Sequence, residues 1–352
     1  MKPQIFPLVF RIPLRGYNLK RKFPILLGGY QMEKKRFQIL CLDGGGIKGL
    51  FSAAFLAKLE EDLKINIIDH FDLIVGTSTG GIIALGLGLG LSPRKLVEFY
   101  FSEGPKIFKK ISLFTFMKHI LVNKYSSSRL ESIFRKDDCF GEKVLGSSNK
   151  RLVIPSYDID SGDIYIFKTA HHKRFKRDYM IPAWKVARAT SAAPSFFSVS
   201  RRIDNIGLID GGVWANNPVM VGLVEAISIL GIPLDSLRIL SIGTTEVLKR
   251  NPKYLDILGG WLFWAKATLE LIMQAQSVSV TAQTSLLLKD QFERVSPKVP
   301  KNLFELDKLN MNELFAFAAK HSRNFSPTFE QKFKDYIANE FIPEYKLKEG
   351  GK

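Results

Sequence analysis

Cysteine is almost absent from this sequence. Among 352 residues only Cys41 and Cys139 carry a thiol. Two thiols cannot form a framework of several disulfides or a four-cysteine zinc site. The sequence is therefore neither a disulfide-rich domain nor a four-cysteine zinc domain. A reducing cytoplasm is therefore the expected location.

The sequence also has no apolar run suited to a membrane helix. The longest uncharged stretch, Ile74 to Leu91, contains six glycines and the polar triplet Thr77–Thr79, unlike a membrane span of about 20 apolar residues. Residues 1–31 contain six Lys/Arg, no acid and four prolines, and they show no apolar segment with a secretory cleavage site. We expect residues 1–35 to be a basic, loosely ordered extension, and translation starting at Met32 is a further hypothesis.

The chain has fewer acidic than basic residues. The chain has 34 Asp+Glu against 51 Lys+Arg, which gives a formal net charge of +17. This charge favours a nucleotide, a nucleic acid or an anionic lipid surface as partner, but no nucleic-acid-binding module is visible, so no specific nucleic-acid binding is expected. The stretch Lys106–Lys118 is typical of either a membrane-surface helix or an ordinary amphipathic helix. Lys168–Arg177 is either an anion-binding loop or a solvated hairpin tip.

Hydrophobic residues make up 46% of the chain, enough for a large core, and their pattern is that of an α/β protein. Two apolar strands, Phe37–Leu42 and Phe71–Val75, are each followed by a glycine-rich turn and a helix, Leu50–Leu63 and Ile82–Leu89. This order predicts parallel, right-handed βαβ units. The remaining expected elements are strands at Leu152–Tyr157, Ile164–Lys168, Ile206–Ile209 and Leu237–Ile242, and a helix at Pro218–Leu230 capped by Asn217. We expect a catalytic core over residues 36–245 and a helical C-terminal part, residues 246–352, packed on it.

The first chemical motif is Gly76-Thr77-Ser78-Thr79-Gly80. It lies between a predicted strand and a predicted helix, which is the context of a nucleophile elbow, and small residues flank the serine because that turn is crowded. The start of the helix favours negative charge beside the serine. Ser78 is therefore the predicted nucleophile, with Gly76 and Gly80 as supporting residues.

The second motif is Asp43-Gly44-Gly45-Gly46-Ile47-Lys48-Gly49. It matches the dinucleotide-binding pattern G-x-G-x-x-G, so an oxidoreductase is the natural rival. A carboxylate next to the pyrophosphate position disfavours that reading, and the second strand ends in the serine turn instead of an acidic residue. An oxyanion hole made by Gly44, Gly45 and Gly46 fits better, supported by Lys48 and Gly49.

The base for Ser78 has to come from elsewhere in the chain. A Ser-Asp-His order would require His321, whose surroundings (AAKHSRN) indicate a surface residue. Asp210 follows a predicted strand, and Gly211 and Gly212 allow close approach of the backbone. Because burial raises the pKa of a carboxyl, Asp210 can take the serine proton directly. A Ser78–Asp210 dyad is predicted.

Together, DGGGIKG, GTSTGG and the segment DGGVWANNP at Asp210–Pro218 resemble the patatin-like phospholipase family, and so does RATSAAP at Arg188–Pro194. The resemblance covers roughly residues 36–245. It implies a three-layer α/β fold with a mostly parallel central sheet between helices, and a lipid acyl hydrolase that uses Ser78, Asp210 and the Gly44–Gly46 oxyanion hole. Lys48 departs from the family pattern, in which many members carry Arg at this place.

Within that family, the segment Phe37–Leu63 and the run from Asp210 to Ala226 look most like bacterial effectors of cyclic-oligonucleotide anti-phage systems. This implies a phospholipase that is switched on by a cyclic dinucleotide and degrades the inner face of the cell's own membrane. We expect no metal, because no His/Asp/Glu ligand set is clustered in the sequence. A constitutive lipid esterase or thioesterase with the same dyad and a catalytically inactive, basic binding module remain alternatives.

Overall fold

The computed structural model describes residues 36–107, 124–247, 261–299 and 310–347, which all belong to one compact unit. The extension predicted over residues 1–35 and most of the basic stretch 106–118 lie outside the described residues. In all of these ranges, no helix is long and apolar enough to cross a membrane.

A mixed, mostly parallel sheet forms the centre of the described chain. Seven strands take part, in the order β4-β3-β2-β1-β6-β8, with β5 also paired to β3. Strands β3, β2, β1, β6 and β8 are mutually parallel, whereas β4 and β5 run antiparallel to β3. The bounds are β1 Phe37–Leu42, β2 Leu73–Gly76, β3 Arg151–Asp158, β4 Asp163–Lys168, β5 Leu208–Asp210, β6 Leu237–Ile242 and β8 Phe292–Val295; β7 Glu246–Val247 and β9 Lys298–Val299 pair separately.

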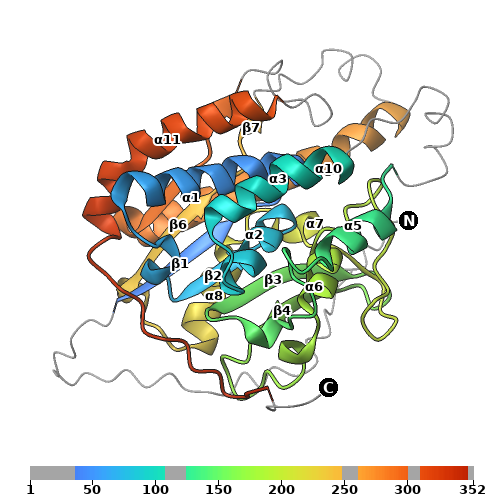
Figure 1. Cartoon of the computed structure of the whole chain (residues 1–352), viewed down its shortest axis with the longest axis horizontal. Coiled ribbons are helices and arrows are strands. Elements are labelled where there is room, and N and C mark those ends of the chain that lie inside the picture. The colour runs from blue at the N-terminus through green and yellow to red at the C-terminus, as the bar shows by residue number, and fades with distance from the viewer. Residues whose placement is uncertain (1–35, 108–123, 248–260, 300–309, 348–352) are drawn as a thin grey trace, which may run out of the picture. The chain divides into compact units, whose positions relative to one another are not determined.

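Helices cover both faces of this sheet (Figure 1). Because side chains alternate along a strand, Leu40 and Leu42 of β1 face one layer and Ile39 and Cys41 face the other. On the first face lie α1 Gly49–Leu63, α2 Thr79–Gly88, α3 Pro93–Ile107, α5 Ser127–Phe134, α6 Ala183–Thr190 and α11 Met311–Lys332. On the second lie α8 Val219–Val224 and α10 Trp261–Leu288, and the short α7 Gly212–Ala215 follows β5.

Aromatic packing fixes α11 to the first layer. Figure 1 shows α11 alongside α1, although more than two hundred residues separate them in sequence. The ring of Phe329 is fully buried and packs against His70, Phe71 and Phe333. The C-terminal region therefore shares the hydrophobic core of residues 36–245.

The predicted strands all form. Strands β1 and β6 have the predicted bounds, and β2 to β5 differ from theirs by one or two residues. The predicted helix at Pro218–Leu230 begins at Val219, with Asn217 Oδ1 accepting from the Val219 N–H at 3.2 Å, and it changes into a π-helix over Glu225–Ile229. The C-terminal part is more than helical, because it supplies β8, which pairs with β6 at the edge of the main sheet.

Candidate active site

Ser78 occupies a strained turn between β2 and α2. Its backbone has a φ of 55°, a conformation that few non-glycine residues adopt. The Ser78 N–H donates to Thr190 Oγ1 at 3.0 Å, which fixes the turn from outside. A Cβ atom added to Gly80 would collide with the backbone at Leu42 and Asp43, so the helix start can approach β1 only with glycine there. The predicted tight turn between strand and helix is present, with Ser78 at its tip.

Asp210 lies beside Ser78 at the end of β5. Ser78 Oγ donates to Asp210 Oδ2 at 2.6 Å, across 132 residues of sequence. The other carboxylate oxygen, Oδ1, accepts from the Gly212 N–H at 2.7 Å. Both side chains are buried, with Ser78 7% and Asp210 4% exposed. The structure thus brings the two predicted catalytic residues into direct contact at a site that is largely shielded from solvent.

This setting changes the acidity of Asp210. Burial disfavours the charged carboxylate and raises the pKa of Asp210 to about 6, although the hydrogen bonds from Ser78 and Gly212 act in the opposite direction. At neutral pH the group is a carboxylate whose basicity lies close to the working pH. That combination suits a general base.

The RATSAAP segment holds the two halves of the dyad together. Thr190 Oγ1 accepts a hydrogen bond from the Ser78 N–H and donates one to the Pro155 carbonyl of β3 at 2.6 Å. Two residues further on, the Ala192 carbonyl accepts from the Asp210 N–H at 3.1 Å. Sequence analysis identified this segment only as part of a family pattern, and the structure gives its physical use.

The glycine loop follows β1 and lies against Ser78. A Cβ atom added to Gly44 would be 3.4 Å from Ser78 Cβ. The Gly44 N–H donates to the Asn216 carbonyl at 2.9 Å, so this N–H is engaged within the protein. Within the described ranges no hydrogen bond uses the N–H groups of Gly45 and Gly46, and Gly46 has a φ of 59°. Of the three predicted oxyanion-hole residues, these two have an available donor.

Arg294 is a site residue that sequence analysis missed. Its guanidinium holds the carboxylate of Asp43 with two hydrogen bonds, Nη1–Oδ1 at 2.8 Å and Nη2–Oδ2 at 2.5 Å, and Nη1 also donates to Ser241 Oγ at 2.7 Å. Both partners are largely buried, with side-chain exposures of 11% and 4%. A bidentate pair of this kind fixes orientation as well as position, so Arg294 on β8 anchors the first residue of the glycine loop.

The other supporting residues lie around this loop and turn. The Lys48 ammonium is 3.4 Å from the Thr245 carbonyl, at the start of α1. A Cβ atom added to any of the remaining supporting glycines would lie too close to a neighbouring group: Gly49 to Thr79, Gly76 to Gly80, Gly211 to Pro155 and Gly212 to Asp210. The structure therefore places every predicted site residue in one region.

None of the histidines that the structure describes has a hydrogen bond to Ser78 or Asp210. His70 contacts the Tyr336 carbonyl, His171 contacts Glu225, and the ring of His321 packs against Phe51 and Phe317. In the part of the chain that the structure describes, no three His, Cys, Asp or Glu side chains are grouped as metal ligands would be. The serine in this site has a carboxylate as its partner.

Comparison with known proteins identifies the family. The model of the patatin-like phospholipase family matches residues 40–223. A cGAMP-activated phospholipase from Pseudomonas aeruginosa is 32% identical over 283 residues, covering 78% of this chain and 84% of the relative. One of the same name from Escherichia coli is 36% identical over 241 residues, covering 64% and 67%. Patatin-like protein 4 of Arabidopsis thaliana is 30% identical over 319 residues, covering 79% and 78%.

These matches confirm three predictions: the patatin-like α/β fold, the resemblance to cyclic-dinucleotide-activated bacterial phospholipases, and the enzyme class of lipid ester hydrolase. The chain belongs to the patatin-like phospholipase family.

Proposed function

We propose that this chain is a phospholipase in which Ser78 and Asp210 cleave fatty acyl esters of membrane glycerophospholipids, and that a cyclic dinucleotide switches it on. The observation that carries the proposal is the 2.6 Å hydrogen bond between Ser78 Oγ and Asp210 Oδ2 inside a buried strand–helix elbow. The names of the bacterial relatives, cGAMP-activated phospholipase, support the activator and the lipid substrate. A role in anti-phage defence and action at the inner face of the cell membrane are further parts of the proposal.

Acylation begins when Ser78 Oγ attacks the ester carbonyl carbon. Asp210 takes the serine proton, and the carbonyl oxygen becomes an oxyanion that accepts hydrogen bonds from the Gly45 and Gly46 N–H groups. Collapse of the tetrahedral intermediate breaks the bond to the glycerol oxygen, which receives the proton from Asp210. The products of this half-reaction are a lysophospholipid and an acyl-Ser78 ester.

Deacylation repeats the same steps with water. Asp210, again a carboxylate, removes a proton from the water as the water attacks the acyl-enzyme carbonyl, and the same two N–H groups stabilise the second oxyanion. Ser78 leaves with the proton, and the fatty acid is released. The dyad needs no third residue, because Asp210 is held by Gly212 and by the backbone of Ala192.

The test is fatty-acid release from phospholipid vesicles by the full chain, with and without cGAMP and other cyclic dinucleotides. We expect release with one nucleotide, and Ser78→Ala should lower its rate by at least about a thousandfold. Ser132→Ala is the matched control, because it removes the hydroxyl of an exposed serine on α5 that donates to the Arg129 carbonyl of its own helix. This control should stay active.

Each result bears on a different part of the proposal. Equal release with and without nucleotides would retain the hydrolase and remove the switch, in favour of a constitutive lipid esterase. Release that survives in Ser78→Ala would remove the dyad mechanism. No release from vesicles together with hydrolysis of soluble esters or thioesters would replace the phospholipase with a different serine hydrolase.

A further inference from the structure

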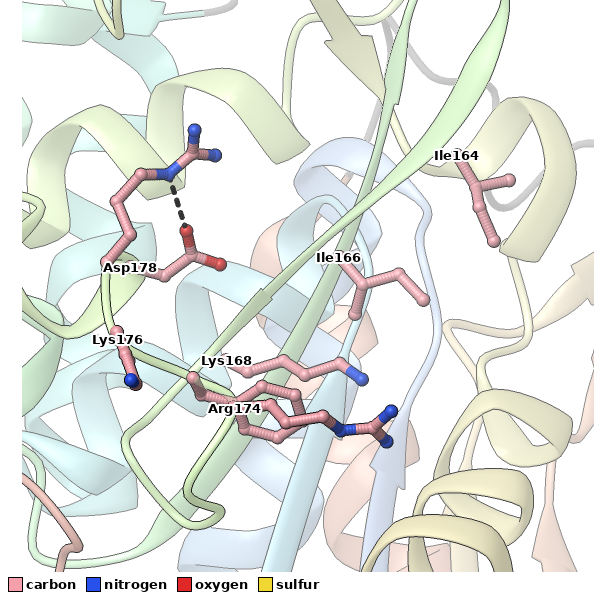
Figure 2. Close-up of a pocket in the computed structure, with 8 residues that line it drawn as sticks. Ile164, Ile166, Lys168, Arg174, Lys176 and Asp178 are labelled. Atoms are coloured by element: carbon pink, nitrogen blue, oxygen red, sulfur yellow. Dashed lines mark hydrogen bonds and ion pairs between the residues drawn. The ribbon is translucent and has the colours of Figure 1, made fainter. Parts of the chain in front are cut away.

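A basic pocket lies along β4, the edge strand of the main sheet. Its volume is about 350 Å³, within the range of small-ligand sites. Figure 2 shows it in close-up. The residues that line it come from β4 and from the segment after it: Ile164, Ile166, Lys168, Arg174, Phe175, Lys176, Arg177 and Asp178.

Positive charge dominates this pocket. Four of the lining residues are cationic and one is acidic, and the acid, Asp178, already faces Arg177 Nε at 3.5 Å. Within the described part of the chain, the side chains of Arg174 and Lys176 have neither a hydrogen bond nor an ion pair. Lys168 and Arg174 line the same pocket, and in the view of Figure 2 their side chains extend in the same direction. Their charged ends can therefore act on one anion.

The pocket also offers apolar surface. Ile164 and Ile166 are two residues apart on β4 and project from the same face of the strand. The Phe175 ring is half-buried, and the Lys168 ammonium lies 4.6 Å from its centroid. Cations beside an aromatic ring and aliphatic side chains suit a ligand that has both a phosphate and a flat or apolar part.

Lys168 connects the pocket to the interior. Its Nζ is 2.5 Å from Glu225 Oε2, and the other oxygen of Glu225 contacts His171 Nε2 at 2.9 Å. Glu225 opens the π-helix that continues α8, and such irregular turns are frequent at functional sites. Helix α8 in turn follows α7 and Asp210 in the chain. An anion that draws Lys168 toward the pocket would thus alter the ion pair at the end of this catalytic segment.

We propose that the pocket formed by Lys168, Arg174 and Phe175 binds a phosphodiester anion. Two sources share this chemistry: a free cyclic dinucleotide and the headgroup of an anionic phospholipid. That ligand binding here regulates hydrolysis rests on the proposed function, whereas binding itself does not.

Two charge-reversal variants in the same segment test the pocket. Arg174→Glu removes a lining cation, and Lys173→Glu makes the same change of charge at an exposed neighbour that does not line the pocket. The probes are cGAMP, measured by titration calorimetry, and phosphatidylglycerol vesicles, measured by sedimentation. We expect Arg174→Glu to weaken binding of one probe by about tenfold or more, since it removes a charge-assisted hydrogen bond. Lys173→Glu should change that binding less than about threefold, and Arg174→Lys should restore part of it.

The source of the phosphodiester follows from which probe responds. Loss of cGAMP binding assigns the pocket to the nucleotide, and activation of fatty-acid release should then need correspondingly more cGAMP. Loss of vesicle binding alone assigns it to a lipid headgroup. Two results would contradict the pocket. One is an equal loss of binding in Arg174→Glu and Lys173→Glu, and the other is no loss of binding in either variant while the melting temperature is unchanged. Binding of cGAMP that Arg174→Glu weakens, in a chain that releases no fatty acid under any condition, would keep the pocket and remove the proposed function.

Discussion

At the scale of single residues, the acidity of Asp210 follows from two opposing effects. Burial removes water from the carboxylate and raises its pKa, while the hydrogen bonds from Ser78 and Gly212 stabilise the charged form and limit the rise. The result is a pKa of about 6. A fully solvated aspartate would be a much weaker base, and an uncompensated buried one would remain protonated at neutral pH.

The first prediction is the pH dependence of the activated enzyme. Because Asp210 must be deprotonated to accept the serine proton, kcat/KM should fall as the pH drops through about 6, tenfold for each pH unit below it. The measurement is initial rates of fatty-acid release between pH 4.5 and 8, after verifying that the protein stays folded across this range. A rate that does not vary between pH 5 and 7 would contradict Asp210 as the base.

The second prediction concerns Arg294, which acts on the glycine loop through Asp43. Arg294→Lys keeps the charge but has one nitrogen in place of the planar two-nitrogen fork that holds Asp43, so the Gly45 and Gly46 donors should lose their alignment. We expect kcat to fall by about tenfold to a hundredfold with little change in KM. A normal kcat would remove the positioning role.

The matched control for Arg294→Lys is Arg201→Lys. Arg201 forms the same two-hydrogen-bond pair with Asp160, at 2.7 and 2.8 Å, but that pair is exposed. The Arg201→Lys variant should keep a kcat within about twofold of the wild type, since surface ion pairs contribute little to stability. A similar loss in both variants would indicate a general effect of losing bidentate pairs.

The proximity of the candidate catalytic residues could be predicted because each lies in a local pattern. Ser78 and the loop glycines follow predicted strands, and the requirement for small residues at such turns is visible in the sequence. Arg294 could not be predicted, since its partner Asp43 is 251 positions away. The hydrogen bond from the Gly44 N–H to the Asn216 carbonyl could not be predicted either, because β5 and α7 determine where that carbonyl lies.

At the scale of elements, the interior strands of the sheet could be predicted, whereas the edge strand β8 could not. Strand β1 is buried at every position, so a continuous apolar run marks it. Strand β8, with the sequence FERV, has two partly exposed polar positions and only four residues. Nothing in its local pattern distinguishes it from a loop, and its pairing with β6 determines that it is a strand. The π-helix after α8 was not predicted either, and Glu225 at its start contacts Lys168 and His171, which are more than fifty positions away in the sequence.

The third prediction concerns the packing of α11 on the core. Phe329→Ala removes a fully buried ring that contacts His70, Phe71 and Phe333. It should lower the free energy of unfolding by about 3–5 kcal/mol, measured by urea denaturation. Phe329→Leu fills most of the space and should cost distinctly less. A change under about 1 kcal/mol for the alanine variant would mean that α11 is not part of the cooperative core.

At the scale of the whole molecule, the net charge of +17 would affect how the chain reaches the membrane substrate that we propose for it. A positive protein is drawn to a negatively charged bilayer over distances comparable with the Debye length, about 10 Å at 0.1 M salt. The attraction is long-ranged and needs no particular residue. It therefore acts before the ester enters the site.

The fourth prediction is a salt dependence of membrane binding. Binding to phosphatidylglycerol vesicles should weaken at least about tenfold between 50 and 300 mM NaCl, while binding to phosphatidylcholine vesicles should be weak throughout. Sedimentation of Ser78→Ala with vesicles measures this without lipid breakdown. Binding that is indifferent to both salt and headgroup charge would show that apolar contacts dominate instead.

The pair between Asp43 and Arg294 also has a consequence during synthesis. A ribosome adds about 5–20 residues per second, so the 251 positions between the two partners correspond to roughly 10–50 s. The glycine loop and Ser78 are therefore synthesised well before the arginine that holds the loop. A nascent chain thus carries Ser78 for this whole interval without the contact between Arg294 and Asp43, and the candidate site is complete only after β8 has been made and has paired with β6.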